Sequence, residues 1–251
     1  MIDIVQNSNG APLIRSSVSD FCASMGYCEL RINHYLKGIK PPQTKITIDG
    51  AIMHEKEAIY EKEHFKFEPV TPETLLDFTR DVEFAREGVF TRFERDISFG
   101  KERTVLLVYG KADKVLRRKG TLIIEDSKFP EYKDKYRDQF EPFNDQKLQV
   151  LLYLSSRFSG DSSSQEECFD IACENKAWII NIKDKSTMKN IKTFQGYQTK
   201  EAEEFLDQKI SRFAMIILGK LRPMHHGNLK KCARCRFTAC EHKVRKIRNT
   251  E

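Results

Sequence analysis

The stretch TLIIEDSK, residues 121–128, decides the fold, because an apolar run there ends in two acidic residues and a lysine. Such a run is typical of a buried β-strand. Side chains alternate between the two faces of a strand, so Asp126 and Lys128 share a face with Ile124. Glu125 points to the other face. A carboxylate beside a lysine at a strand end can hold a divalent metal ion and orient a water molecule against a phosphodiester.

A second strand is predicted directly before this one. Residues 104–116 are rich in β-branched and apolar side chains, and Arg117–Gly120 forms a plausible hairpin turn in which glycine takes the left-handed position. Asp113 lies near the end of this second strand. The hairpin therefore brings a second carboxylate towards Asp126.

Two predicted helices carry further polar residues. The first spans about residues 50–65 and contains His54, and the second spans about residues 145–158 and contains Gln149 and Tyr153. Residues four apart lie on one face of a helix, so Gln149 and Tyr153 can reach the same groove. Other expected elements are a helix within residues 16–39 that a serine caps, a strand over 89–99, two short strands within 169–182 and a helix over 200–219.

The composition is that of a globular protein with a highly charged surface. The 251 residues are 39% hydrophobic and 32% charged, with a net charge of +6. No apolar run approaches the length of a membrane span, and the N-terminus lacks the pattern of a signal peptide, so we expect a cytoplasmic protein that does not bind membranes. Residues 230–248 contain eight Lys or Arg and one acidic residue, and such a stretch can follow a phosphate backbone or form a solvated tail.

Seven cysteines are present, and three of them, Cys232, Cys235 and Cys240, fall within nine residues. An odd number of cysteines without a sign of secretion makes a disulfide framework a poor explanation. Clustered thiolates suit Zn²⁺ or an iron–sulfur cluster, each of which takes four ligands. The fourth ligand must then come from a distant part of the chain, where Cys28 and Cys22 are the candidates.

In their order along the chain, the polar residues resemble the motifs of the RecB-like PD-(D/E)XK nucleases. His54 matches the histidine of the first helix, Asp113 the acidic residue of the second motif, and Asp126-Ser127-Lys128 the D-x-K core. Gln149 and Tyr153 match the Q-x-x-x-Y motif of the RecB-like branch. The resemblance implies catalysis by Asp113, Asp126 and Lys128, DNA positioning by Gln149 and Tyr153, and a Mg²⁺ or Mn²⁺ site formed by His54, Asp113, Asp126 and Ser127.

The cysteines resemble those of a narrower group, which comprises the CRISPR-associated RecB-like exonucleases, exonuclease V and the AddB nuclease domain. The surroundings of Cys28 are closest to the CRISPR-associated version. This resemblance implies a [4Fe–4S] cluster held by Cys28, Cys232, Cys235 and Cys240, with Zn²⁺ and Cys22 as the alternatives. The chain departs from the pattern at Glu29, where a proline is common, and in its shorter spacing between Cys235 and Cys240.

The implied fold is α/β, with a restriction-endonuclease-like core in which a central mixed sheet is flanked by helices. We expect a single RecB-like nuclease domain over residues 1–251. Residues 50–222 would form the nuclease core, and residues 16–48 and 223–251 would together form the cysteine-cluster region. The metal cluster would join these N- and C-terminal segments.

The implied function is that of a metal-dependent DNA exonuclease that acts on single-stranded DNA. By resemblance it would process DNA fragments in CRISPR adaptation, with the CRISPR integrase complex as a partner. One alternative is a stand-alone DNA-repair exonuclease. Another, from a different class, is a non-catalytic DNA-binding or scaffold subunit with a structural metal cluster.

Overall fold

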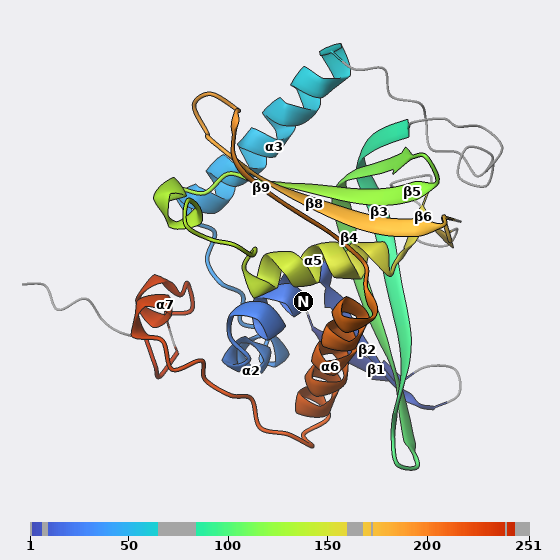
Figure 1. Cartoon of the computed structure of the whole chain (residues 1–251). Coiled ribbons are helices and arrows are strands. Elements are labelled where there is room, and N and C mark those ends of the chain that lie inside the picture. Colours follow the sequence, from blue (N-terminus) through green and yellow to red (C-terminus); the bar gives the residue numbers. More distant parts are fainter. Residues whose placement is uncertain are drawn as a thin grey trace, which may run out of the picture.

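The structure of the chain is a computed structural model that describes residues 2–6, 10–64, 84–159, 168–171, 173–238 and 240–243 (Figure 1). A mixed β-sheet lies at the centre, and helices flank it. The strands are β1 (Asp3–Gln6), β2 (Pro12–Ser17), β3 (Phe84–Phe99), β4 (Glu102–Arg118), β5 (Thr121–Lys128), β6 (Arg157–Ser159), β7 (Cys168–Phe169), β8 (Asn175–Lys183) and β9 (Asn190–Tyr197). The helices are α1 (Val18–Cys22), α2 (Leu30–Leu36), α3 (Lys45–His64), α5 (Asn144–Leu154), α6 (Lys200–Ile217) and α7 (Leu229–Arg234), with a π-helix η1 (Ala23–Tyr27) and a 3₁₀-helix η2 (Lys133–Tyr136).

The sheet follows the order β7-β6-β3-β4-β5-β8-β9, and β2 joins it beside β4. β4 pairs antiparallel with β3 and with β5, whereas β5 pairs parallel with β8. The predicted hairpin between β4 and β5 is present, and Lys119 and Gly120 adopt φ values of 46° and 72° in its turn. Positive φ at both central residues matches the right-handed twist of the two strands. The predicted mixed sheet flanked by helices is therefore confirmed.

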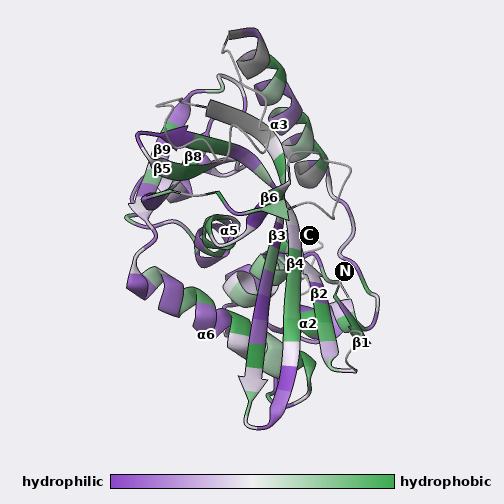
Figure 2. Ribbon diagram, turned by 90° about the vertical axis from the view of Figure 1, so that its right-hand side faces the viewer, coloured by the Kyte–Doolittle hydropathy of each residue, from purple (hydrophilic) through white to green (hydrophobic). Residues whose placement is uncertain are grey.

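Helices α5 and α6 pack together on one side of the sheet (Figure 2). In α6 the buried residues Leu206, Ile210, Phe213 and Ile217 recur at helical spacing, so this helix presents one apolar stripe to the core. α5 is buried along most of its length and lies against β5 and β8. This placement brings Gln149 of α5 to the C-terminal end of β5.

The N-terminal segment is helical within residues 16–39 and capped by a serine, as predicted, but it is not one continuous helix. Residues 12–17 form β2, which pairs parallel with β4, and helix α1 begins only after Ser17. Ser17 caps that helix, since its Oγ accepts a hydrogen bond from the backbone N–H of Asp20 at 3.0 Å. The helical segment is then divided into α1, η1 and α2. Pairing with β4, which is remote in sequence, keeps residues 12–17 extended up to the cap of α1.

A segment near the start of the chain lies beside the C-terminal helix α7. Figure 1 shows α7 next to α2, and the Tyr27 hydroxyl donates a hydrogen bond to the carbonyl oxygen of Lys231 at 2.8 Å. None of the helices in the described part of the chain is both long and apolar enough to cross a membrane.

Candidate active site

The acidic residues meet where β4 and β5 leave their shared ladder. The register pairs Lys114 with Glu125, so Asp113 and Asp126 are the next residues along the two strands. The backbone N–H of Ser127 donates a hydrogen bond to Asp113 Oδ2 at 3.2 Å. The hairpin alone thus places both carboxylates side by side at the point where the β4–β5 ladder ends.

Asp126 and Glu125 lie on opposite faces of β5, as the alternation of side chains along a strand predicts. Asp126 is buried, with 1% of its surface exposed. Glu125 lies on the other face, where it accepts hydrogen bonds from Lys114 Nζ at 3.4 Å and from Asn181 Nδ2 at 2.9 Å. Glu125 therefore supports the sheet and does not join the carboxylate pair.

Lys128, Asp126 and Gln149 form a closed triangle of polar contacts. Lys128 Nζ lies 2.7 Å from Asp126 Oδ2 and donates to Gln149 Oε1 at 3.0 Å. The Gln149 amide nitrogen donates to Asp126 Oδ1 at 3.1 Å. One glutamine side chain consequently fixes both members of the D-x-K pair from α5.

Tyr153 anchors this glutamine from the next turn of the helix. Its hydroxyl donates to the Lys111 carbonyl oxygen at 2.9 Å and accepts from Gln149 Nε2 at 3.4 Å. The ring passes close to β4 at Gly110, where a Cβ atom would stand 2.8 Å from Tyr153 Cε1. Only glycine leaves room for the ring there.

His54 reaches the same place from helix α3. Its Nδ1 lies 3.5 Å from Asp113 Oδ2, and its ring packs edge-on against Phe129 at a centroid distance of 5.2 Å. The structure therefore brings all the residues predicted from the nuclease motifs into one site, from α3, β4, β5 and α5.

Burial and mutual charge shift the pKa values of these groups. Burial raises the pKa of Asp126 to about 7, and the nearby charge of Asp113 adds to this although Lys128 opposes it. Burial likewise raises the pKa of Asp113. For Lys128, burial lowers the pKa, but the carboxylates of Asp126 and Asp113 outweigh it and the pKa is raised overall. Burial and Lys128 lower the pKa of His54. Lys128 thus stays charged, and His54 is neutral near pH 7 and able to act as a ligand.

The donor atoms fit a hard divalent cation. Asp126 Oδ2 is buried and faces the Lys128 ammonium at 2.7 Å, and Asp113 Oδ2 lies 3.5 Å from His54 Nδ1. Asp113 and Asp126 carry two negative charges when ionised, against the single positive charge of Lys128, and a bound cation would offset the remainder. Two carboxylates suit Mg²⁺ or Mn²⁺, and an added imidazole nitrogen favours tolerance of Mn²⁺. The carbonyl of Ser127 as a further ligand stays a prediction.

Two residues of the site were not predicted, Glu57 and Lys183. Glu57 is 7% exposed and accepts a hydrogen bond from Ser127 Oγ at 2.9 Å, and it forms an ion pair with Lys183 from β8. Glu57 stands three residues after His54, so helical spacing could have indicated that both face the site. No local signal marks Lys183, because it arrives through the parallel pairing of β5 with β8.

The cysteine region comprises Cys28, Cys232, Cys235 and Cys240 and lies where the segment after η1 meets the C-terminal tail. Cys28 and Cys232 are buried, and Cys235 and Cys240 are partly buried. Burial raises the pKa of Cys28, and the charge of Cys235 adds to this. Burial also raises the pKa of Cys232, to which the charges of Cys240 and Cys235 contribute. These charge effects link Cys28 with Cys235, and Cys232 with Cys235 and Cys240, and a cluster on the four thiols stays a prediction.

Cys22 lies apart from the tail thiols. Its pKa is raised by burial and then by the charge of Asp145, the second residue of α5, with no contribution from Cys232, Cys235 or Cys240. This placement favours Cys28 over Cys22 as the partner of the tail cysteines.

Glu29 ties the cysteine region together. It stands where the nucleases that this sequence resembles commonly have proline. Its carboxylate accepts two hydrogen bonds from Arg212 of α6, at 2.5 Å and 2.8 Å, and a third from the Met224 backbone N–H at 2.7 Å. The departure from proline thus has a structural use, because one carboxylate fastens α6 and the start of the tail to the segment that holds Cys28.

No protein-family model matches the chain, and no curated protein sequence matches it. Among solved structures, the crystal structure of SSO0001 is similar over 96% of this chain and 90% of its own, with a TM-score of 0.51 and 18% identity. LHK-Exo, solved in complex with dAMP, is similar over 80% of this chain and 87% of its own, with a TM-score of 0.43 and 10% identity. At these identities the likeness to SSO0001 concerns the fold alone.

Proposed function

We propose that this chain is a metal-dependent deoxyribonuclease. One observation carries the proposal: Lys128 Nζ is held between Asp126 and Gln149, directly beside the pair formed by Asp113 and His54. Phosphodiester hydrolysis needs charge neutralisation at the phosphate and a positioned water molecule. This arrangement offers a cation site and a fixed positive charge within one site.

The residues divide this work between them. Asp113, Asp126 and His54, with the Ser127 carbonyl, would hold Mg²⁺ or Mn²⁺, and a bound ion would neutralise the phosphate and polarise its oxygens. Lys128 stays protonated and aligns the attacking water or stabilises the charge that develops on the phosphate. Gln149 keeps Lys128 and Asp126 in place, and Tyr153, which is buried, supports Gln149 from the interior instead of contacting DNA as the motif resemblance implies. Glu57 and Lys183 hold Ser127 from the other side of the site.

The motif resemblance supports the finer assignment, in which the enzyme is an exonuclease for single-stranded DNA with a [4Fe–4S] cluster on Cys28, Cys232, Cys235 and Cys240. The cluster would join the N- and C-terminal segments and stabilise the part of the protein that faces incoming DNA. We place its biological role in the processing of DNA fragments for CRISPR adaptation, in contact with the integrase complex. A repair exonuclease is the alternative with the same chemistry.

The decisive experiment is cleavage of end-labelled single-stranded DNA by the full-length protein with Mg²⁺, Mn²⁺ or EDTA. We expect wild-type protein to cleave with either metal and not with EDTA, and Asp126→Asn to be inactive. Glu125→Gln is the matched control, because it changes the adjacent carboxylate on the opposite face of β5. Metal-independent cleavage, or equal loss in both variants, would contradict the proposed site. DNA binding without cleavage by folded wild-type protein would instead indicate a scaffold subunit.

The finer assignment needs substrates that differ in their ends. A linear single strand labelled at either end gives the polarity, and a circular single strand should resist an exonuclease. Cleavage of the circle at the same rate would show endonuclease action. A requirement for the integrase complex of the same genome in trimming DNA fragments would favour CRISPR adaptation over repair.

A further inference from the structure

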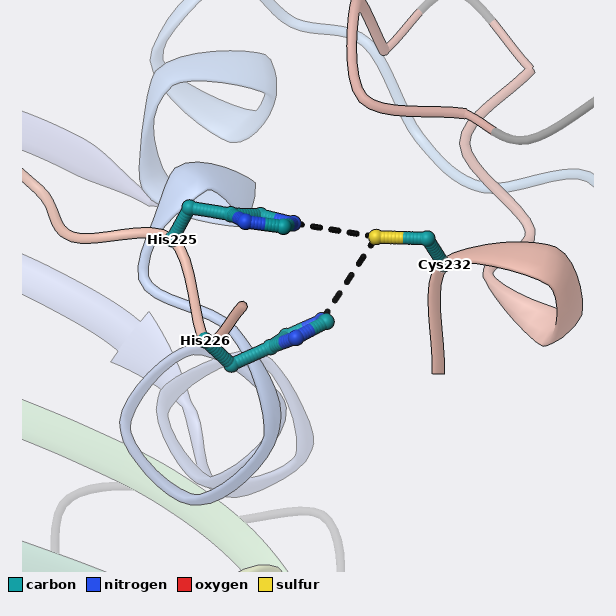
Figure 3. Close-up of side chains that lie close together, drawn as sticks. All are labelled: His225, His226 and Cys232. Atoms are coloured by element: carbon teal, nitrogen blue, oxygen red, sulfur yellow. Dashed lines mark hydrogen bonds between the residues drawn. The ribbon is translucent and has the colours of Figure 1, made fainter. Parts of the chain in front are cut away.

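Two histidines that the nuclease site does not use face one of the cluster cysteines. Figure 3 shows His225 and His226 directed at Cys232 from the segment before α7. His225 Nε2 lies 2.9 Å from Cys232 Sγ, and His226 Nε2 lies 4.0 Å from it. The three atoms fall within 4.8 Å of one another, a spacing that a metal ion could bridge.

The Nδ1 atom of each ring shows whether Nε2 can bind a metal ion or instead donates a hydrogen bond. The backbone N–H of Gly227 donates to His225 Nδ1 at 3.1 Å, and the backbone N–H of Asn228 donates to His226 Nδ1 at 2.9 Å. An imidazole nitrogen that accepts a hydrogen bond carries no proton, so the proton of each ring sits on Nε2. The nitrogen that faces the sulfur therefore lacks the lone pair that a metal ligand needs. Both histidines present an N–H group to Cys232.

Neighbouring groups hold this geometry in place. The His225 ring stacks on His242 at a centroid distance of 4.2 Å, and the His226 ring packs edge-on against Tyr27 at 5.9 Å. Asn228 caps α7, since its side-chain oxygen accepts from the Lys231 N–H at 3.1 Å and its carbonyl oxygen accepts from the Cys232 N–H at 3.1 Å. The segment that presents the histidines is thus fastened to the helix that presents the thiol.

We infer that His225 is a positioning residue for the iron–sulfur cluster, which it serves through an N–H···S hydrogen bond to Cys232, with His226 as a weaker second donor. The inference rests on the [4Fe–4S] part of the proposed function. A donor to a ligating thiolate stabilises negative charge, and the reduced cluster carries one more negative charge than the oxidised cluster. The hydrogen bond therefore raises the reduction potential. The shorter distance of His225 makes its effect the larger one.

The test is a redox titration of the full-length protein after anaerobic cluster reconstitution, followed by optical and electron paramagnetic resonance spectra. We expect His225→Leu to lower the reduction potential, His226→Leu to lower it less, and His225→Gln to restore it, because a glutamine amide keeps an N–H donor at similar reach. His34→Leu is the matched control: this histidine stacks on Phe237 in the same region, at a centroid distance of 4.6 Å. The reduction potential of His34→Leu should equal that of the wild-type protein.

The outcomes separate this inference from the proposed function. A wild-type protein without iron and sulfide after reconstitution would overturn the cluster itself. A cluster whose potential is unchanged in His225→Leu would overturn the inference and leave the cluster standing. Bound Zn²⁺ that is lost in His225→Leu and His226→Leu would overturn it in favour of a ligand role. If His225→Leu retains no cluster, retention in His225→Gln supports the inference and loss in both contradicts it.

Discussion

The active site and the cysteine region are assembled in different ways. The two carboxylates and Lys128 come from one β-hairpin, and Gln149 of α5 bonds to both members of the D-x-K pair. The cysteine region instead joins segments about 200 residues apart, through the Tyr27 bond to Lys231 and the Glu29 contacts with Arg212 and Met224. A change within the hairpin should therefore act on chemistry, whereas a change in the links between the chain ends should act on stability.

We expect the largest effect from Lys128→Ala, which tests whether a change within the hairpin acts on catalysis. Removal of one preorganised charge at a reacting centre typically lowers the turnover rate by about 100- to 1,000-fold. We expect a loss of this size in cleavage of single-stranded DNA, with unchanged circular dichroism. Lys114→Ala is the control, since Lys114 pairs with Glu125 on the other face of the sheet. Activity within a few-fold of wild type in Lys128→Ala would remove Lys128 from the proposed mechanism.

The buried carboxyl group of Asp126 should make the stability of the protein depend on pH. The folded-state pKa of Asp126 stands at about 7, above the value of about 3.9 for an exposed aspartate. The folded state thus binds this proton more tightly than the unfolded state does. The stabilisation is fully present below about pH 4 and is lost as the pH rises through about 7, at roughly 1.4 kcal/mol per pH unit at most.

Urea unfolding in EDTA between pH 4.5 and pH 8 measures this effect. The free energy of unfolding of wild type minus that of Asp126→Asn should fall as the pH rises, and should level off above about pH 7. Saturating Mg²⁺ should reduce the slope, because a bound cation stabilises the ionised carboxylate. A difference that is flat with pH would show that Asp126 is ionised throughout in the folded protein.

Glu29→Gln tests whether the contacts that hold the cysteine region act on the stability of the protein. The variant keeps the shape of the side chain but loses the charge that Arg212 faces, and Arg212 is partly exposed, so we expect a loss of about 1–2 kcal/mol. For a chain of this size the melting temperature should fall by about 2–4 °C per kcal/mol. DNA cleavage well below that temperature should stay near wild type. A parallel loss of cleavage would mean that the two regions are coupled.

Tyr153→Phe should have the smallest effect. It removes the hydrogen bond from the hydroxyl to the Lys111 carbonyl, which is worth about 0.5–1.5 kcal/mol, and it leaves the ring packed against Gly110. We expect a modest fall in stability and only a few-fold loss of cleavage, measured under the conditions used for Lys128→Ala. A loss as large as that of Lys128→Ala would give Tyr153 a direct part in the reaction.

The active-site residues could be predicted because each stands on an element with a strong local pattern. The alternation over residues 121–128 separated Asp126 from Glu125, and the structure places them on opposite faces. The interval of four residues between Gln149 and Tyr153 put them on one face of α5, where they are hydrogen-bonded to each other. Glu57 was missed although the same helical rule applies to it, since no motif drew attention to a glutamate three residues after His54.

The chain ends were harder to predict, because their structure depends on distant partners. Residues 12–17 form a strand because they pair with β4, a partner about 90 residues away in the chain, and no local pattern predicts this pairing. Nothing local in His225 and His226 distinguishes them from solvated histidines of a basic tail. Their role follows only from the folded segment that aims both rings at Cys232.

The sequence by itself determined the central hairpin, the helices that carry His54 and Gln149, and the side of β5 on which Asp126 lies, because periodicity and turn residues act over a few neighbours. Only the tertiary structure decided the parallel partners β2 and β8, the ion pair of Glu57 with Lys183, the placement of Cys28 apart from Cys22, and the direction of the two histidine N–H groups. These features arise from contacts between segments far apart in the chain, and no short-range pattern encodes them.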